Sequence, residues 1–209
     1  NEFVVGVKQI YQAAWNPVMG LSDTYSRHIW GIISDPATFK HPFTGETFPV
    51  RAKWQVETAG PNGKLDVPQE AKSWNPILQK WDNVASNTLA TSKVIFDFNF
   101  SNWHNGERMD MNDILHSLYF TTEWGTQTDE NDKTFDTEFT PRAAQSIDTI
   151  IGVNQIDKDT LEVYVDYWHF DEGEIADWAI LWNLMPWEIT VAMEKAVMDG
   201  KVSFSRSGA

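Results

Sequence analysis

The sequence contains no cysteine, and this absence excludes several kinds of site. With no Cys among its 209 residues, the chain has no disulfide framework, no thiolate metal ligand and no cysteine nucleophile. No apolar run approaches the ~20 residues that a membrane-spanning helix needs. No signal peptide is visible, and the chain begins at Asn1 instead of Met, as expected of a processed protein or a shortened chain.

Basic residues are also few. The chain has 16 Lys and Arg against 30 Asp and Glu, which gives a formal net charge of −14. Nucleic-acid phosphates and anionic membrane surfaces would be repelled by such a chain. We therefore expect no nucleic-acid partner.

Known catalytic patterns are missing as well. The sequence has no nucleophile elbow, no phosphate-binding loop and no dinucleotide fingerprint. The acidic pairs at 171–172 and 174–177 are explained more simply by a helix N-terminus than by a glycosidase pair. None of the histidines has the spacing of a metal site; they are His28, His41, His104, His116 and His169. We predict no catalytic residue, no metal site and no cofactor, and therefore a protein that is not an enzyme.

Two further sequence features have more than one interpretation. The loop at 125–140 is rich in Asp and Glu, but it lacks the spacing of a calcium-binding loop, so we interpret it as a solvated acidic loop. The 11 tryptophans are scattered from Trp15 to Trp187. A scattered set indicates packing in the core more often than a stacking platform for a ligand.

The strongest structural signal lies at 94–124. A strand is predicted first, with alternate apolar residues on one face: Val94, Phe96, Phe98 and Phe100. Asn105-Gly106 then predicts a tight turn, because both residues tolerate positive φ. An amphipathic helix follows, with Asp110 as N-cap and Asp113 near the positive end of the helix dipole. Its apolar face consists of Met111, Ile114, Leu115, Leu118 and Tyr119, and His116 is expected to face solvent.

Strands and helices are predicted along the rest of the chain. Strands are expected at 3–7, 50–58, 147–156 and 161–165, the third and fourth forming a hairpin, and a hairpin-like turn is expected at 60–63. Helices are expected at 25–33, 68–81 with an interruption at Asn75-Pro76, 143–146, 174–183 and 186–199. Trp54 and Val56 should point inward from their strand. The helix at 25–33 is expected to bury Ile29, Trp30 and Ile33, and the last helix is expected to bury Ile189, Met193, Ala196 and Val197. Pro186 is placed at the first position of the last helix, and Gly200 after its end.

The segment 103–117 resembles the signature of the family 5 extracellular solute-binding proteins, the peptide- and oligopeptide-binding components of ABC importers. The residues that match this signature are Trp103, His104, Gly106, Asp113 and Ser117. Asn105 replaces the usual Asp, Asp110 replaces the usual Thr at the helix cap, and Met111 replaces a small residue. Asp110 keeps the capping chemistry. We interpret these positions, Asp110 included, as a structural signature.

Two further passages resemble the same family and occur in its order. They are 42–54, PFTGETFPVRAKW, and 155–165, QIDKDTLEVYV. The resemblance implies an α/β fold, or α+β in some schemes, with mixed sheets and flanking helices, as part of a type II periplasmic-binding-protein-like architecture. It places the start of lobe I at 1–45, lobe II at 46–168 and a truncated return toward lobe I at 169–209. Relative to the family, 73–87 is an extra tryptophan-rich segment that would decorate the lobe.

The resemblance also implies a function. The chain would be the first part of a longer receptor that binds a solute, a peptide or oligopeptide in most members, and delivers it to ABC permease subunits. Relatives of this kind bind nickel, sugars and other small solutes. The loop before the first helix lies near the ligand cleft in the family, so Asn16, Asp23 and Tyr25 are the candidate ligand-binding residues. A third lobe, which usually supplies most ligand contacts, would be absent. The protein is expected to be extracellular or periplasmic, anchored at the cell surface.

A second interpretation stays open. The acidic, tryptophan-rich composition also fits a fragment of a secreted carbohydrate-binding or polysaccharide-degrading protein, because aromatic faces stack on sugars. Three or more coplanar exposed Trp rings on one face would favour that reading. A strand–turn–helix at 94–124 within a mixed sheet would favour a solute receptor. For Asp23 and Tyr25 a purely structural role, as a helix cap and a packing residue, also stays open.

Overall fold

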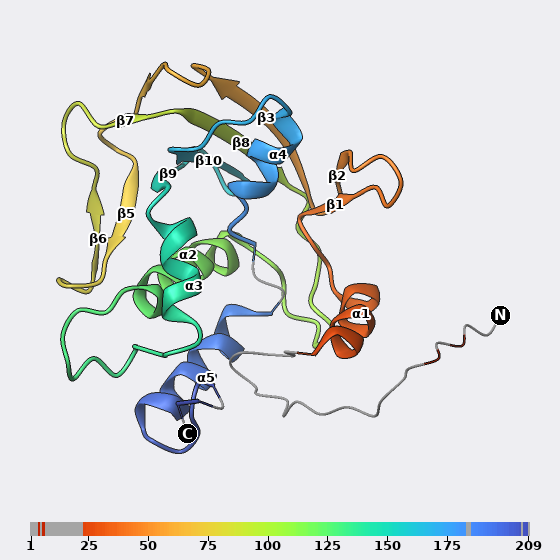
Figure 1. Cartoon of the computed structure of the whole chain (residues 1–209), viewed down its shortest axis with the longest axis vertical. Helices are drawn as coiled ribbons and strands as arrows, with labels where there is room; N and C mark the ends of the chain where they lie inside the picture. The colour runs from red at the N-terminus through yellow and green to blue at the C-terminus, as the bar shows by residue number, and fades with distance from the viewer. Residues whose placement is uncertain (1–3, 5, 7–22, 183–184, 206, 209) are drawn as a thin grey trace.

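A six-stranded antiparallel sheet is the centre of the fold. The computed structural model describes residues 4, 6, 23–182, 185–205 and 207–208 (Figure 1). The sheet has the strand order β3 (Ala52–Thr58), β8 (Ser92–Phe98), β10 (Thr160–Val165), β9 (Ile150–Gln155), β5 (Lys72–Asn75) and β6 (Lys80–Asn83). The predicted strand at 3–7 and Asn16 lie outside the described residues.

Strand β8 organises the core, as its alternating pattern predicts. Val94, Phe96 and Phe98 are buried, and Phe100 packs against them. Phe96 is paired with Trp54 on one side of the strand and with Leu161 on the other. The inward positions predicted for β3 are confirmed, because Trp54 and Val56 pack against this core. Apolar side chains on both neighbouring strands thus continue the buried face of β8 across the sheet.

The predicted hairpin of β9 and β10 is also confirmed. Its strands pair in antiparallel register, with Val153 opposite Val163. The Asp157 carboxylate accepts hydrogen bonds from the backbone N–H groups of Asp159 and Thr160, at 3.0 and 2.8 Å. An Asp side chain that closes a turn in this way fixes the register of the strands that it joins.

Two smaller sheets lie beside the central one. Strand β1 (Thr38–Lys40) pairs with β2 (Thr47–Pro49), and β4 (Leu65–Asp66) pairs with β7 (Leu89–Ala90). The turn predicted at 60–63 forms, with Gly60 at φ +76°. It does not close a hairpin, because β3 and β4 belong to different sheets.

The helices gather in separate places around the sheet. They are α1 (Thr24–Ile33), α2 (Met111–Gly125), α3 (Thr140–Ile147), α4 (Glu172–Trp178) and α5 (Trp187–Met198). Helix α4 packs beside β3 and β8, whereas α2 packs on β5, α3 and α5 (Figure 1). Helix α4 ends several residues before the predicted boundary at 183. Pro186 is the N-cap of α5, not its first residue, and Gly200 follows the helix at φ +71°.

The helix predicted at 68–81 is wrong, because this segment forms the hairpin of β5 and β6. Trp74 is paired with Trp81 across the hairpin, with ring centroids 5.7 Å apart. The Asn75 side chain accepts hydrogen bonds from two backbone N–H groups of the turn, and Gln79 adopts φ +49°. The hairpin extends the central sheet through a pairing of β5 with β9. The tryptophan-rich segment therefore extends one edge of the sheet, and its status as an addition relative to the family stays a prediction.

The predicted buried faces of α1 and α5 are also wrong in part. Ile29 is 63% exposed and Trp30 is 38% exposed, while the side chain of Ile33 lies outside the described part of the chain. In α5, Ile189 is 43% exposed, and the buried positions are Thr190 and Glu194. Apolar periodicity locates these helices correctly, but the side that faces the protein depends on neighbours distant in the sequence.

The tryptophans are mostly packing residues. Trp103, Trp124 and Trp182 are buried, and Trp54 and Trp81 pack against the core. The more exposed tryptophans are Trp30, Trp168, Trp178 and Trp187. These four lie on different segments, so the scattered pattern indicates packing, as the sequence predicts.

The fold class is α+β. Every strand pairing among the described residues is antiparallel, so the parallel pairs of a mixed sheet are not seen there. The flanking helices are present as expected. None of the helices described has the length and hydropathy to cross a membrane. The lobe boundaries stay a prediction.

Candidate functional site

The turn after β8, at 101–108, is named the signature turn, and hydrogen bonds between its own backbone groups stabilise it. The Trp103 N–H donates to the Glu107 carbonyl at 2.8 Å, and the Gly106 N–H donates to the Trp103 carbonyl at 2.9 Å. Gly106 has φ +91°, a conformation that other residues adopt only with strain. Asn102 forms a bridge with Arg108 across the base of the turn. The predicted turn is thus confirmed, with glycine where positive φ is required.

Helix α2 begins in a capping box. The Asp110 carboxylate accepts from the backbone N–H of Asn112 at 2.8 Å, and Asp113 accepts from the backbone N–H of Asp110 at 3.0 Å. Each carboxylate satisfies an N–H group that the helix leaves without a partner. The predicted cap at Asp110 is confirmed, and Asp113 takes a second role in it.

Asp113 joins three segments of the chain. Its side chain is 2% exposed, and it also accepts from the Trp103 indole at 3.4 Å and from the Trp187 backbone N–H at 3.0 Å. Burial raises the pKa of this carboxyl above its usual value, and the hydrogen bonds oppose that rise. Asp113 therefore holds the turn, the start of α2 and the start of α5 in one arrangement.

A stack of aromatic rings fixes the turn from its other side. The rings of Trp103 and Trp182 are parallel within 7°, with centroids 5.7 Å apart. The Trp182 indole donates to the Asp35 carbonyl at 2.6 Å. Trp103 is thereby held between the Asp113 carboxylate and a second indole. Its structural role in the signature is clear from these contacts.

A pocket of about 520 Å³ opens beside this turn. Its walls are the end of α1, the loop that follows, the signature turn and the start of α5. The lining residues are Trp30, Ser34, Asp35, Arg51, Asn102, Trp103, His104, Asn105, Met109, Pro186 and Ile189. Volumes of 300–1,000 Å³ are typical of small-molecule sites. We therefore take this space, named the turn pocket, as the candidate functional site.

The charges of the turn pocket neutralise each other. Arg51 pairs with Asp35, and its Nη1 also donates to the Asn99 carbonyl at 2.7 Å and the Ser101 hydroxyl at 3.1 Å. These bonds occupy most donors of the guanidinium, which therefore shapes the pocket instead of offering a free cation. Among the described residues, the side chains of Asn102 and His104 have no hydrogen-bond partner, so both can donate to or accept from a ligand.

Two of the predicted ligand-binding residues, Asp23 and Tyr25, lie at the start of α1 and are not among the lining residues of the turn pocket, which α1 meets at its other end. Asp23 caps α1 and accepts from the Ser26 backbone N–H at 3.0 Å. Hydrogen bonds with Ser26 lower the pKa of its carboxyl. Tyr25 is 41% exposed on the first turn of α1. Asn16 lies outside the described residues, so ligand contact by these three stays a prediction.

Sequence reasoning missed most of the lining. Trp30 and Ser34 are one helical turn apart at the end of α1, and an exposed Trp in an amphipathic pattern could have been a signal. Arg51 lies within the passage at 42–54 that resembles the family. His104 was assigned to the structural signature, yet it lines the pocket. Ser117 is half-buried on α2, away from this lining.

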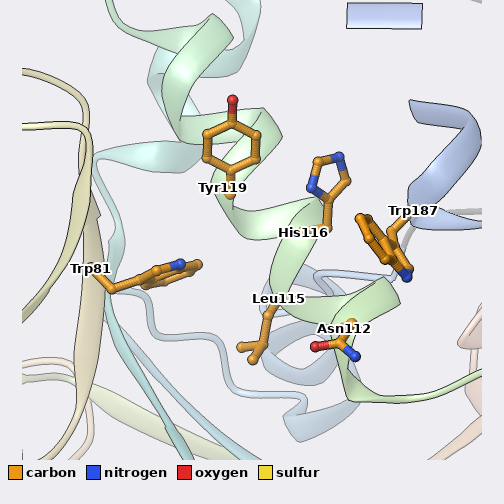
Figure 2. Close-up of a pocket in the computed structure, with 6 residues that line it drawn as sticks. All are labelled: Trp81, Asn112, Leu115, His116, Tyr119 and Trp187. Atoms are coloured by element: carbon orange, nitrogen blue, oxygen red, sulfur yellow. The ribbon is translucent and has the colours of Figure 1, made fainter. Parts of the chain in front are cut away.

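The expectation for His116 is wrong. The side chain is half-buried, and its Nε2 atom is buried with no hydrogen-bond partner. Its ring lies 5.2 Å from that of Tyr119 and 6.2 Å from that of Trp187 (Figure 2). Helix α5 packs against α2 near His116, so the face of α2 that was expected to be exposed to solvent is partly covered.

Several acidic side chains accept hydrogen bonds from nearby backbone N–H groups. Asp132 accepts from the backbone N–H of Thr128 at 2.8 Å, and Asp136 accepts from that of Phe139 at 2.8 Å. Asp136 is buried, so the loop at 125–140 is solvated only in part. Asp171 caps α4 through Gly173, which agrees with the helix interpretation of the pair at 171–172. Among the described residues, no group of three or more His, Asp or Glu could hold a metal ion.

Comparison of the sequence with models of known protein families and with curated proteins gave no match. The family stays a prediction that rests on the residues of the signature and of the two shorter passages.

Proposed function

We propose that this chain is part of an extracellular solute-binding protein of the family 5 type, which binds a peptide or oligopeptide for import by an ABC transporter. It would act as a receptor and not as an enzyme. In such a receptor, lobes close on a solute in a cleft, and permease subunits recognise the closed form. The receptor would be exported and anchored at the cell surface.

One observation carries this proposal. The signature turn and the end of α1, with Trp30 and Ser34, both line the turn pocket. The resemblance places the ligand cleft near the loop that precedes α1. The strand–turn–helix of β8 and α2 meets one half of the expectation for a receptor, while the mixed sheet, its other half, is antiparallel throughout the described residues.

The chemistry of the turn pocket suits a peptide. The indoles of Trp30 and Trp103 offer apolar surface for a side chain, while Asn102 and His104 can hydrogen-bond a peptide group. Because Arg51 is neutralised by Asp35, the pocket has no free charge to select a charged side chain. Selection in this part of the cleft would therefore depend on shape and hydrogen bonding.

The alternative, a carbohydrate-acting fragment, has less support. It requires exposed tryptophans on one platform. The four more exposed tryptophans lie on different segments, and none of them stacks on another among the described residues. Trp178, for example, stacks on Tyr167 instead.

Thermal unfolding of the full-length receptor in the presence of peptides and of oligosaccharides tests the proposal. A ligand that binds only the folded state raises the melting temperature. We expect peptides to raise it and oligosaccharides to leave it unchanged. A rise in melting temperature with oligosaccharides alone would indicate that the solute is a sugar. If the added polymer is also shortened, the protein is an enzyme.

Two variants locate the peptide site. His104→Ala should reduce the shift caused by peptide without changing the melting temperature of the free protein, because this side chain makes no hydrogen bond within the described chain. Phe170→Ala is the control, since Phe170 is 83% exposed and lies outside the lining of the turn pocket. Equal peptide shifts in both variants would place binding elsewhere.

A further inference from the structure

A second pocket lies on α2, separate from the turn pocket. Its volume is about 350 Å³. Figure 2 shows its floor on one face of α2, with Trp81 of β6 on one side and Trp187 of α5 on the other. The floor residues are Asn112, Leu115, His116 and Tyr119, which share a helix face by their spacing. We name this space the aromatic pocket, because four of its six lining residues carry aromatic rings.

The rings of the aromatic pocket are held in place by neighbours. Trp74 packs edge-on against both Trp81 and Tyr119, with centroid distances of 5.7 and 4.6 Å. The Tyr119 hydroxyl donates to the Glu194 carboxylate at 2.8 Å. The Trp187 backbone N–H is fixed by Asp113. The aromatic pocket is therefore pre-organised, which reduces the entropy cost of binding.

The electrostatic surroundings of the aromatic pocket are negative. No Lys or Arg among the described residues lines it. Glu194 lies behind Tyr119, Glu123 accepts from the Trp74 indole at 2.6 Å, and Glu188 acts electrostatically on His116. Burial lowers the pKa of the His116 imidazole, which favours its uncharged form at neutral pH. Aromatic faces with carboxylates behind them attract a cation.

We propose that the aromatic pocket binds a quaternary ammonium group, such as the trimethylammonium head of a small organic cation. The lining residues that the structure describes include no carboxylate, so a primary ammonium or guanidinium group would leave several N–H donors without partners. A quaternary ammonium group has no N–H donor. A sugar would need many polar partners, and the lining offers few beyond Asn112 and His116. This site goes beyond the proposed solute cleft and does not depend on it.

Calorimetric titration of the whole chain with choline and with 3,3-dimethylbutan-1-ol tests the proposal. The second compound has the shape of choline but carries carbon in place of the charged nitrogen. We expect choline and tetramethylammonium chloride to bind, and the neutral compound to bind about tenfold more weakly, since one cation–π contact of about 1.4 kcal/mol gives that factor. Equal binding of both compounds, or no binding of choline at millimolar concentration, would overturn the proposal.

Variants then place choline in the aromatic pocket. Trp187→Leu and Trp81→Leu should each weaken choline binding about tenfold and leave the neutral compound nearly unchanged, because leucine keeps apolar volume without the ring face. Trp168→Leu is the matched control, because Trp168 is 39% exposed against 36% for Trp187 but does not line the pocket. Trp30→Leu in the turn pocket should leave choline binding intact. Unchanged choline binding in both pocket variants would contradict the assignment.

Discussion

Helices α1 and α2 begin alike and lie in different environments. Both start with an Asp N-cap in extended backbone, Asp23 and Asp110, whose side chain accepts from a backbone N–H of the first turn. Helix α2 buries Ile114 completely, whereas α1 leaves Ile29 63% exposed. In Figure 1, α2 lies under the sheet between other helices, and α1 lies at the edge of the molecule. The comparison teaches that local sequence starts a helix, while its packing decides how much the helix contributes to stability.

The largest expected contrast between the two helices is in apolar burial. Ile114→Ala in α2 should lower the free energy of unfolding by about 2–5 kcal/mol, because it opens a cavity in the core. Ile29→Ala in α1 should change it by less than about 0.5 kcal/mol. Denaturant unfolding of both variants measures the difference. Similar losses in both would mean that α1 is buried as deeply as α2.

The second contrast concerns Asp113, which has no counterpart in α1. Asp113→Ala should lower the free energy of unfolding by about 2–3 kcal/mol, because the N–H donors of Asp110, Trp103 and Trp187 lose their acceptor. Asp113→Asn keeps one acceptor oxygen and should cost less. Chemical unfolding gives both values. If Asp113→Ala is as stable as the parent, these hydrogen bonds do not join the three segments.

A smaller loss of stability is expected from a substitution in the signature turn, which precedes α2. Gly106→Val should cost about 1–2 kcal/mol, because valine is strained at φ +91°. Steric overlap does not contribute, since a Cβ atom at Gly106 would meet nothing within 4 Å. The melting temperature reports the loss, and Gly31→Ala in α1, where a Cβ also meets nothing, is the control. A variant that melts normally would exclude a structural role for this glycine.

The caps themselves should differ less. Asp110→Ala should cost about 1 kcal/mol of global stability, because α2 unfolds with the core. Asp23→Ala should cost less globally and instead increase hydrogen exchange of the amides in α1 alone. Equal global costs would show that α1 unfolds together with the sheet.

A pH effect completes the comparison, since α2 also packs against a buried acid of α5. Burial raises the pKa of Glu194 above its value in the unfolded chain. As the pH rises through the unfolded value, the unfolded state loses its proton first, so the fold loses stability. Glu194→Gln removes this loss and can still accept from Trp124 and Tyr119. We expect its stability relative to the parent to increase between about pH 4 and pH 7. A difference that does not change with pH would contradict the raised pKa.

The sequence by itself determined the strand–turn–helix at 94–124 and the hairpin of β9 and β10. Alternation of period two, the Asn105-Gly106 pair and the Asp110 cap are signals within a few residues of each other. Such signals act through local backbone conformation. They remain valid in any tertiary context that buries the apolar face.

Only the tertiary structure decided the rest. Residues at 68–81 carry a helix-start pattern, yet they form a hairpin because β5 pairs with β9 and Trp74 packs on Tyr119. The turn pocket and the aromatic pocket each join segments that are distant in the sequence, and α5 supplies Ile189 to the first and Trp187 to the second. Long-range contacts of this kind compete with local propensity and override it when they bury more surface. Local sequence patterns do not specify which distant segments will pack together.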